Sequence, residues 1–361
     1  MKGVYELRFA FMCKEPPSVV PGRGKLKVAI VGGGPAGLSA AGFLVCQGYD
    51  VYVFDKQPIA GGLMLFAIPE ERIPPESVLE GIEELRDKFN VNFMVKTKVF
   101  GDTKPREDEG DNLVERVVSL KELVDNYDAI LLTTGTWCSR KLNCPGEEGP
   151  GVMSALEFLY ELRIYEKGYT SHKPHLGNRV VVIGGGLSAV DAALEALRLG
   201  AKEVVMAYRR TIKQAPAGVY EIKKLINRGV KWIELVSPIK IVRENGEVKG
   251  IELQKMKLGE PDESGRPRPI PIPGSEFVLE ADTIIEAIGE IPTPPFEDEY
   301  LGLKADRRGR IQVNEHFRTT HPKIWAAGDV VTGPSMVGSA VRQGLYAAKS
   351  IHIYLTSKKL I

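Results

Sequence analysis

The sequence predicts an α/β protein with two Rossmann-like dinucleotide-binding domains, the second inserted into a discontinuous first domain. Three observations predict this fold. A GxGxxG motif begins at Gly32, between the apolar run 28–31 and a helical segment. A second, closely similar motif begins at Gly184, which is 184 − 32 = 152 residues further along the chain. Near the C-terminus, residues 324–355 again have the pattern of a strand, a Gly-Asp turn and a helix.

The first motif has every part that a dinucleotide site needs. Residues 28–31 are apolar and mostly β-branched, as in a buried parallel strand. Gly32 permits a tight turn, Gly34 lets the backbone approach a pyrophosphate, and Gly37 lets the helix pack closely on the strand. The helix N-terminus offers N–H groups and partial positive charge to the phosphates. Asp55, which is 55 − 32 = 23 residues after Gly32, ends the second strand and can accept hydrogen bonds from a ribose diol.

The second motif differs from the first at the position that selects the nucleotide. Its glycines are Gly184 and Gly186, with Ala189 in the third place. Where the first motif ends its second strand on an acid, this one has Arg209 and Arg210. An acid suits a free ribose 2′-hydroxyl, whereas arginine suits a 2′-phosphate, so the second site is predicted to bind NADP(H). The alternative is that the two arginines only cap an edge strand.

The bulk composition excludes several other classes of protein. The 361 residues carry a net charge of +1, which gives no general attraction to nucleic acid or anionic lipid. No apolar run is long enough to span a membrane and no signal peptide is evident, so we expect a cytoplasmic protein without membrane insertion. The cysteines and histidines have no metal-binding spacing, and no metal site is predicted. Cys46 is interpreted as a small core residue; Cys138 and Cys144 could pair, but free thiols are favoured in a reducing compartment.

Four further segments have local signals. Residues 91–99 are expected to form one strand, and the charged stretch 102–112 a solvated turn. Asn245-Gly246 predicts the turn of a β-hairpin. The proline-rich stretch 266–274 is expected to be a loop.

The resulting domain organisation has four parts. An N-terminal extension covers residues 1–24 and ends in a stretch rich in proline and glycine. The first domain takes residues 25–145 and 290–361, and the second takes residues 146–289.

Several motifs together resemble one family of flavoproteins. The loop GGLMLFAIPEERIP, the strand end LLTTG, the YRR after the second motif and the C-terminal AAGDVVTGP all match its pattern. The chain resembles the two-dinucleotide-binding-domain oxidoreductases, and within them the small (β) subunit of glutamate synthase. Adrenodoxin reductase, the flavin module of dihydropyrimidine dehydrogenase and the flavoprotein subunits of sulfide dehydrogenases or ferredoxin:NADP oxidoreductases are similar. The resemblance covers residues 25–355.

This resemblance implies FAD in the first domain and NADP(H) in the second, with hydride passing between nicotinamide and flavin. Such a step needs no side-chain acid or base, so no catalytic residue is predicted. The predicted cofactor-binding residues, from the motifs and the resemblance together, are Gly32, Gly34, Pro35, Ala36, Gly37, Asp55, Lys56, Gly62, Leu63, Ile68, Arg72, Val99, Thr134, Gly135, Gly186, Leu187, Ser188, Arg209, Arg210, Ile288, Gly289, Gly328, Asp329, Met336 and Val337.

The chain also departs from the family. Ala67 replaces a glycine of the flavin loop, and Leu187 stands where relatives often have asparagine. Many relatives carry a cysteine-rich iron–sulfur domain at the N-terminus, but here that region has only Cys13. One thiolate cannot hold a cluster, so we expect any iron–sulfur relay to be on another polypeptide. Related disulfide reductases have a cysteine pair in the flavin loop, where this chain has Leu63 and Met64, so a thiol relay is disfavoured.

Three hypotheses about function follow. The first is a flavoprotein that exchanges electrons with a partner subunit or an iron–sulfur protein, as in glutamate synthase. The second is a free-standing ferredoxin–NADP reductase or NAD(P)H:acceptor oxidoreductase. The third, of another class, is a non-catalytic dinucleotide-binding scaffold or sensor subunit.

Overall fold

The chain folds into two compact units. The structure, a computed structural model, describes residues 12–17, 26–262, 265–297 and 299–357. Of the expected N-terminal extension, only residues 12–17 therefore lie within the described part.

Unit 1 comprises Met1–Cys138 and Glu290–Ile361, and unit 2 comprises Ser139–Gly289. The chain leaves unit 1 at β7 (Cys138–Ser139) and returns to it at β17 (Glu290–Ile291). The inserted unit thus begins at Ser139, whereas the sequence analysis places its start at residue 146.

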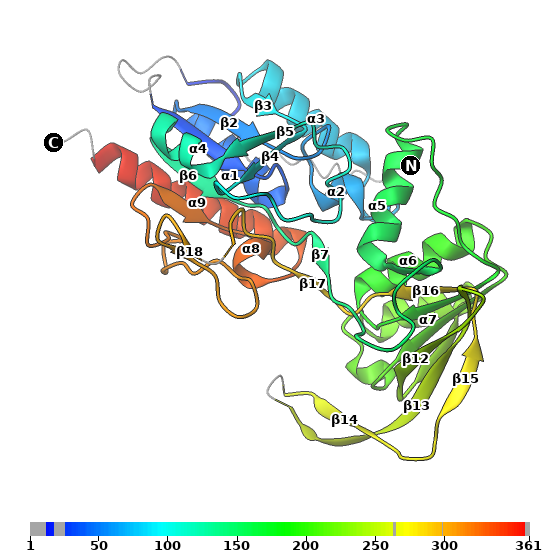
Figure 1. The fold of residues 1–361 in the computed structure, drawn as a ribbon. Coiled ribbons are helices and arrows are strands. Elements are labelled where there is room, and N and C mark those ends of the chain that lie inside the picture. The colour runs from blue at the N-terminus through cyan, green and yellow to red at the C-terminus, as the bar shows by residue number, and fades with distance from the viewer. Residues whose placement is uncertain (1–11, 18–25, 263–264, 298, 358–361) are drawn as a thin grey trace. The chain divides into compact units, whose positions relative to one another are not determined.

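Unit 1 is built on a five-stranded parallel sheet with the order β20-β6-β1-β2-β3 (Figure 1). Its C-terminal strand pairs with β6, which is itself the neighbour of β1. The last part of the chain therefore returns to the sheet of the first motif, which confirms the discontinuous domain. The strands are β1 (Lys27–Val31), β2 (Asp50–Phe54), β3 (Asn92–Met94), β6 (Ala129–Leu132) and β20 (Ile324–Ala326).

Two long helices of unit 1 lie side by side although they are far apart in the sequence (Figure 1). A Cβ on Gly344 would lie 2.1 Å from the carbonyl oxygen of Ala36, so this glycine permits the close approach. Nearby, the hydroxyl of Ser39 donates to the carbonyl of Val341 at 3.2 Å. The first helix is covered by both the sheet and the last helix, which explains why it has almost no polar face. The helices are α1 (Pro35–Cys46), α2 (Leu63–Phe66), α3 (Pro75–Asp87), α4 (Leu120–Asn126), α8 (Asp329–Thr332) and α9 (Val337–Ser357).

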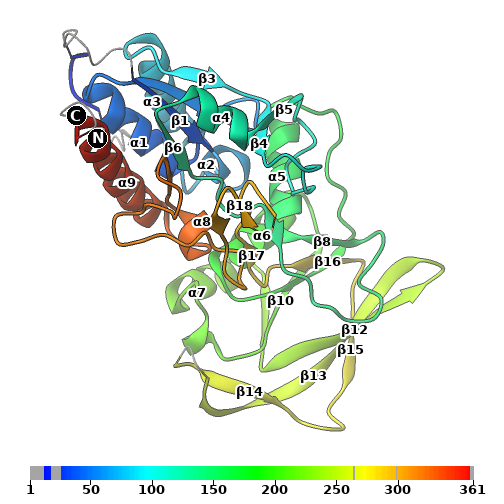
Figure 2. The ribbon, with the colours of Figure 1, turned by 60° about the vertical axis from the view of Figure 1, so that its left-hand side comes forward.

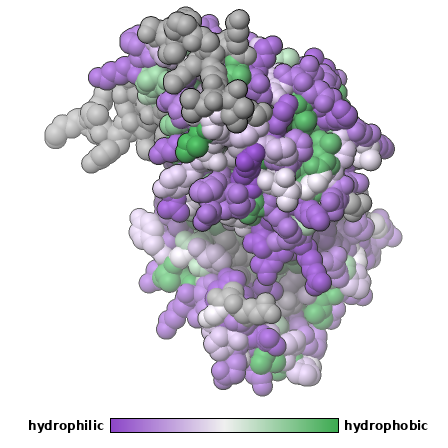
Figure 3. All heavy atoms as spheres, turned by 90° about the vertical axis from the view of Figure 1, so that its left-hand side faces the viewer, coloured by the Kyte–Doolittle hydropathy of each residue, from purple (hydrophilic) through white to green (hydrophobic). Residues whose placement is uncertain are grey.

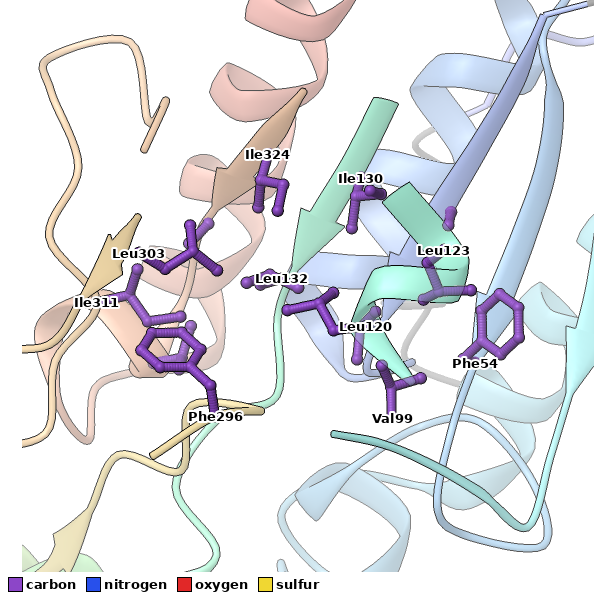
Figure 4. Packing of buried hydrophobic residues seen from close by; sticks show 14 residues of the cluster. Phe54, Val99, Leu120, Leu123, Ile130, Leu132, Phe296, Leu303, Ile311 and Ile324 are labelled. Atoms are coloured by element: carbon purple, nitrogen blue, oxygen red, sulfur yellow. The ribbon is translucent and has the colours of Figure 1, made fainter. Parts of the chain in front are cut away.

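The core of unit 1 joins its two chain segments (Figure 4). Leu132 and Ile130 from β6 pack in one cluster with Ile324 from β20. The same cluster contains Phe296 and Leu303, which follow the return from unit 2. Burial of these side chains, each contributing roughly 1.5–3 kcal/mol, holds the two segments together.

The expected strand over 91–99 is wrong in one respect, because the structure breaks it in two. Lys96 has a φ of 50°, a left-handed conformation that ends β3. The following strand, β4 (Thr97–Phe100), leaves the main sheet and pairs in parallel with β5 (Arg116–Ser119). A further small pair, β18 (Glu299–Tyr300) and β19 (Leu303–Lys304), precedes β20.

Unit 2 repeats the parallel architecture with the strand order β11-β10-β9-β16-β8. Its strands are β8 (Val152–Ser154), β9 (Arg179–Ile183), β10 (Glu203–Tyr208), β11 (Lys231–Glu234) and β16 (Thr283–Glu286). Its helices are α5 (Ala155–Glu166), α6 (Leu187–Arg198), the 3₁₀ turn η1 (Ile212–Gln214) and α7 (Val219–Asn227).

A second, antiparallel sheet belongs to unit 2 (Figure 2). The hairpin predicted at Asn245-Gly246 is confirmed, and both turn residues have positive φ, at 52° and 84°. The proline-rich stretch expected to be a loop instead contributes a strand that pairs with β13. Prolines fit there because they are tolerated on an edge strand. The strands are β12 (Val236–Glu244), β13 (Glu247–Pro261), β14 (Pro267–Pro271) and β15 (Phe277–Glu280).

The interpretation of Cys46 as a small core residue is wrong, because its side chain is half-buried and forms a disulfide. Its sulfur is bonded to that of Cys13, with 5.7 Å between the two Cα atoms. The bond attaches residues 12–17 to the C-terminal end of α1. Cys138 and Cys144 are free, as expected.

The face of the molecule in Figure 3 is covered mainly by hydrophilic side chains, with hydrophobic ones in small separate patches. Within the described residues, no helix combines the length and the apolar character that a bilayer span requires.

Candidate functional site

An elongated cavity in unit 1 opens where the parallel strands end. It has an empty volume of about 1070 Å³, part of it continuous with solvent. Residues that follow β1, β2, β6 and β20 all line it, including Gly32, Asp55, Thr133 and Gly328. Ligands of open α/β sheets bind at this edge, the carboxyl end of the strands.

The glycine loop after β1 forms one wall of the cavity. Gly32 has a φ of 103°, and a Cβ there would lie 2.4 Å from the carbonyl oxygen of Thr133. A Cβ on Gly37 would lie 2.0 Å from the carbonyl oxygen of Gly32, so helix and loop are in direct backbone contact. Gly34 is different, because a Cβ added to it would meet no protein atom within 4 Å and would project into the cavity.

This arrangement fits a bound pyrophosphate. Gly34 is the N-cap of α1, Pro35 follows it, and no side chain caps the helix. The first N–H groups of α1 are therefore available to an anion, and the helix dipole favours one there. A side chain at position 34 would occupy the space in which the phosphates would bind.

Asp55, at the end of β2, is held in place by two backbone groups. The N–H of Gly33 donates to one carboxylate oxygen at 2.6 Å, and the N–H of Gln57 donates to the other at 2.8 Å. The side chain is buried, which raises the pKa of Asp55 from 3.8 to about 6, against the opposing effect of these hydrogen bonds and of Lys56. Asp55 lines the cavity, and each carboxylate oxygen has a second lone pair, so the carboxylate can accept from a ribose diol.

Lys56 contributes to an ion-pair network rather than extending into open space. Its ammonium donates to Asp111 and to the carbonyl of Glu109, each at 2.7 Å, and lies 4.2 Å from the ring centroid of Trp137. Lys98 bonds Asp111 too. Burial lowers the pKa of Lys56, and the neighbouring acids oppose this.

The charged stretch 102–112 is only in part the solvated turn that the sequence analysis expects, because residues 102–104, 107 and 112 are exposed whereas its other acids form ion pairs or are half-buried. Lys98 also bonds Asp108, at 2.9 Å, and the side chain of Asp108 is only 7% exposed. Asp108 and Asp111 thus form ion pairs with Lys56, which follows β2, and with Lys98 in β4, and Asp108 lines the cavity.

Two further loops enclose the other end of the cavity. Gly61 donates its N–H to the carbonyl of Gly33 at 2.8 Å, which ties the loop before α2 to the glycine loop. Thr134 donates its hydroxyl to the carbonyl of Thr293 at 2.7 Å, and the N–H of Thr293 donates to Gly135 at 3.0 Å. The strand end LLTTG is thereby joined to the segment that re-enters unit 1.

The Gly-Asp turn after β20 completes this end. Gly328 donates its N–H to the side-chain oxygen of Gln343 at 3.0 Å, which fixes the turn against α9. Asp329 accepts from the hydroxyl of Ser335 at 2.6 Å, and burial raises its pKa. Met336, which is 64% exposed, precedes the first residue of α9 and lines the cavity. A helix of this length directs positive potential to its N-terminus.

Most of the residues predicted in unit 1 lie around this cavity. Gly37 and Arg72 do not line it: the first packs against the glycine loop, and the second lies on the segment before α3. The predicted residues that line the cavity are Gly32, Gly34, Pro35, Ala36, Asp55, Lys56, Gly62, Leu63, Ile68, Val99, Thr134, Gly135, Gly328, Asp329, Met336 and Val337.

Sequence reasoning missed other lining residues. Lys98, Asp108 and Trp137 all line the cavity. The many lysines and acids of residues 96–111 could have indicated the first two, but that signal does not extend to Trp137. Pro294 and Pro295 line the cavity from the re-entry segment. The described residues that line the cavity include no cysteine. In the same described part, no cluster of His, Cys, Asp or Glu is suited to hold a metal ion.

Unit 2 contains a second glycine loop of the same form. A Cβ on Gly184 would lie 2.3 Å from the carbonyl oxygen of Ala287, whereas a Cβ on Gly186 would meet nothing within 4 Å. Gly186 is the N-cap of α6, which begins at Leu187 and has no side-chain cap. Gly34 and Gly186 thus hold corresponding places, each facing open space in front of an uncapped helix. Ser188 lies in the first turn of α6.

The remaining predicted residues of unit 2 lie at neighbouring strand ends. Arg209 and Arg210 follow β10, and Ile288 and Gly289 follow β16. Ile288 is 37% exposed, and Gly289 has a φ of 108°. The two arginines differ sharply, because Arg209 is exposed and Arg210 is only 2% exposed.

Comparisons with known proteins agree with this geometry. Residues 26–344 match the family described as pyridine nucleotide-disulphide oxidoreductase. The chain is 37% identical to the NADP(+)-dependent formate dehydrogenase subunit beta of Moorella thermoacetica, over 95% of this chain and 45% of that protein. It is 36% identical to the glutamate synthase [NADPH] small chain of Halomonas elongata, over 91% of this chain and 68% of that protein.

A solved structure has the same fold. FprA from Mycobacterium tuberculosis in complex with NADPH matches with a TM-score of 0.74 and 21% identity, over 92% of this chain and 85% of that chain. With the family match and the two glycine loops, it follows that this chain belongs to the pyridine nucleotide-disulphide oxidoreductase family and is an FAD-dependent NAD(P)H oxidoreductase related to the glutamate synthase small chain.

Proposed function

We propose that this chain moves hydride between NADPH and FAD and exchanges electrons with a partner subunit or an iron–sulfur protein, in the cytoplasm. The observation that carries this proposal is the pair of corresponding glycine loops, Gly32–Gly37 and Gly184–Ala189. Each has a glycine facing open space before an uncapped helix N-terminus. One chain with two such loops can hold two dinucleotides.

In this proposal the unit 1 cavity holds FAD. Bound there, FAD would supply the acceptor for hydride and the means to release electrons singly. The backbone at Gly34 and the start of α1 bind the pyrophosphate, and Asp55 accepts from the ribose hydroxyls. The N-terminus of α9 stabilises negative charge at the far end of the cavity, with Asp329 turned toward its own Ser335.

The rest of unit 1 orients the group and excludes water. Trp137 is buried against Gly110, where a Cβ would lie 2.7 Å from the indole ring. Near Trp137, Lys56 and Lys98 line the cavity, and their charges are neutralised by ion pairs with Asp111. No side chain is assigned a proton transfer, in keeping with chemistry that needs only orientation.

The electron partner is inferred from what lines the cavity and from the names of relatives. Within the described lining there is no thiol that could relay electrons to a disulfide substrate. The relatives in Moorella thermoacetica and Geobacter sulfurreducens are named as beta subunits. This chain spans 45% and 52% of those two proteins, and their names as subunits support a separate partner protein for this chain.

The test uses the purified full chain under anaerobic conditions. We expect it to bind FAD with a visible flavin spectrum, and NADPH alone to bleach that spectrum. Bleaching without any acceptor protein would exclude the non-catalytic scaffold. A chain that retains no flavin, or whose flavin neither NADPH nor NADH reduces, would contradict the proposal.

The partner is tested separately by affinity capture from the source organism. Recovery of an iron–sulfur protein, recognised by its absorbance and by its reduction through NADPH and this chain, supports the partner proposal. Efficient reduction of a small acceptor, with no captured partner, would favour the free-standing reductase instead.

A further inference from the structure

A second cavity lies on the surface of unit 1, between the turn 314–318 and residues 346–357 of α9. Its empty volume is about 1180 Å³, part of it continuous with solvent. Trp325 of β20, the edge strand of the five-stranded sheet, is one of its lining residues. None of the described residues that line it also lines the cavity at Gly34. This second cavity, called the α9 groove, is therefore a separate feature of α9, which lies at the edge of unit 1 (Figure 2).

The turn that forms one wall of the α9 groove is held by hydrogen bonds. The N–H groups of His316 and Arg318 both donate to the side-chain oxygen of Asn314, at 2.9 and 3.0 Å. The N–H of Ala326 donates to the carbonyl of Phe317 at 3.0 Å, which attaches the turn to β20. Because this wall is already ordered, little conformational entropy is lost at the turn when a ligand binds.

The guanidinium of Arg318 is fixed beside two aromatic rings of the groove. Its central carbon lies 5.2 Å from the ring centroid of Trp325 and 4.7 Å from that of Tyr354. Its Nη2 donates to the carbonyl of Pro322 at 2.5 Å. No acid among the described residues pairs with it, so its charge is not neutralised. An arginine held in this way is pre-organised to bind a carboxylate.

The facing side of α9 presents a cation between two exposed apolar side chains. Tyr346 and Ile353 are 51% and 67% exposed. Lys349, three residues after Tyr346, lies on the same helix face, with its ammonium 5.6 Å from the tyrosine ring centroid. Within the described part of the chain, Lys349 has no ion pair. Apolar side chains gathered in a groove with charged neighbours are typical of a protein-binding surface.

The charge around the α9 groove is mainly positive. The one acid among its described lining residues is Glu315, whose carboxylate lies 3.6 Å from Nε2 of His316. Arg318 and Lys349 line the groove, and Arg342 is exposed one helical turn before Tyr346. A second copy of this chain packed symmetrically on this face would bring like charges together, which disfavours that occupant. A segment that carries carboxylates is complementary to the groove.

We propose that the α9 groove is the docking site for an acidic segment of the partner protein. An apolar side chain of that segment packs on Tyr346 and Ile353, and carboxylates on either side of it bind Arg318 and Lys349. This inference rests on the proposed function, which includes a partner, and it names the chemistry by which the partner is recognised.

The first test uses random dodecapeptides displayed on phage, with the FAD-loaded full chain as the immobilised target. We expect the recovered peptides to combine two or more acidic residues with an apolar residue such as leucine or phenylalanine. Synthetic copies should bind Lys349→Glu at least about tenfold more weakly, because a charge-assisted contact becomes repulsive. Ile353→Asp should weaken them by a similar factor. Peptides that bind both variants as tightly as the wild type, or that are mainly basic, would overturn the inference.

A matched control is Lys104→Glu, which makes the same change of charge in unit 1. Lys104 is exposed and lines neither cavity. We expect this variant to bind the synthetic peptides as the wild type does, and all three variants to keep the wild-type melting temperature. Equal weakening by Lys104→Glu would show that net charge rather than the groove attracts the peptides, and would overturn the inference.

The second test uses the iron–sulfur protein recovered by affinity capture. Lys349→Glu is expected to raise the KM for that protein at least about fivefold, with little change in kcat. The rate at which NADPH reduces the flavin should not change, because Lys349 is 349 − 337 = 12 residues, or about 18 Å of helix, from Val337 at the other cavity.

The outcomes separate this inference from the proposed function. An unchanged KM with normal flavin reduction would overturn the inference and leave the proposed function intact. Acidic peptides bound through the groove, in a chain whose flavin NADPH does not reduce, would contradict the proposed hydride transfer alone. A wild-type dimer that Ile353→Asp separates, or binding to phosphatidylserine vesicles that Lys349→Glu abolishes, would assign the groove to another occupant and overturn the inference.

Discussion

The carboxylate of Asp55 accepts the backbone N–H of Gly33 at 2.6 Å, which joins the end of β2 to the glycine loop after β1. The predicted ribose site and the predicted pyrophosphate site are therefore one hydrogen-bonded unit. The two should respond together to substitution and to pH.

We expect Asp55→Ala to weaken FAD binding by roughly 10- to 100-fold, because charge-assisted hydrogen bonds to the ribose and to Gly33 are lost. Binding should also depend on pH. The pKa of Asp55 is about 6, so below that pH the carboxyl is protonated and accepts fewer hydrogen bonds. FAD release, followed by flavin fluorescence, should increase as pH falls through 6, and Asp55→Asn should remove that dependence. A wild-type curve that stays flat between pH 5 and 7 would contradict the assignment.

A buried acid in unit 2 should make stability depend on pH. Glu286 is 1% exposed, and neither carboxylate oxygen has a hydrogen-bond partner among the described residues. Burial and the nearby Glu147 raise the pKa of Glu286 from 4.5 to about 8. The folded state therefore favours the protonated form, and this contribution to stability, complete below pH 4.5, is lost as pH rises through 8.

Glu286→Gln keeps the shape and the neutral charge of the protonated acid. We expect the melting temperature of the wild type to fall between pH 6 and pH 9. We expect a smaller fall for Glu286→Gln over the same range. Glu244→Gln, at an exposed position of β12, is the control and should follow the wild type. Identical pH profiles for Glu286→Gln and the wild type would contradict the raised pKa.

The packing of α9 on α1 should depend on Gly344. A Cβ there would lie 2.1 Å from the carbonyl oxygen of Ala36, so Gly344→Ala should destabilise unit 1 by about 1–3 kcal/mol. Gly338 lies on the same helix with nothing within 4 Å of an added Cβ. Gly338→Ala should therefore be neutral or stabilising by up to about 1 kcal/mol. Urea unfolding with and without FAD distinguishes the two, and equal destabilisation would show that helix packing is not the cause.

The disulfide between Cys13 and Cys46 should stabilise unit 1 under oxidising conditions. It closes a loop with a sequence separation of 33, for which chain entropy predicts a contribution of about 4 kcal/mol. Thermal unfolding with and without a thiol reductant measures this, with Cys13→Ser as the permanently reduced comparison. Free-thiol counting that finds four thiols in the unreduced protein would show that the bond does not form.

The two nucleotide loops and their order can be predicted from the amino-acid sequence alone. In each loop the strand, the GxGxxG turn and the helix are contiguous in the sequence. Hydrophobic periodicity and glycine spacing therefore predict their local structure. The hairpin at Asn245-Gly246 was predictable for the same reason, since the turn residues need positive φ. The return of β20 to β6 was predictable from the resemblance of the Gly328-Asp329 turn to the flavin half.

The contacts of particular side chains depend on the three-dimensional fold and could not be predicted. The sequence does not distinguish the adjacent Arg209 and Arg210. In the structure, however, Arg210 is buried and forms an ion pair with Asp262, whereas Arg209 is exposed. In the same way, Lys98 forms an ion pair with Asp108, which lies in a stretch with the composition of a solvated loop. Cys13 forms a disulfide with Cys46, at a sequence separation of 33. The physical reason is that hydrogen bonds and ion pairs depend on distance in space, whereas sequence patterns carry information only about neighbours along the chain.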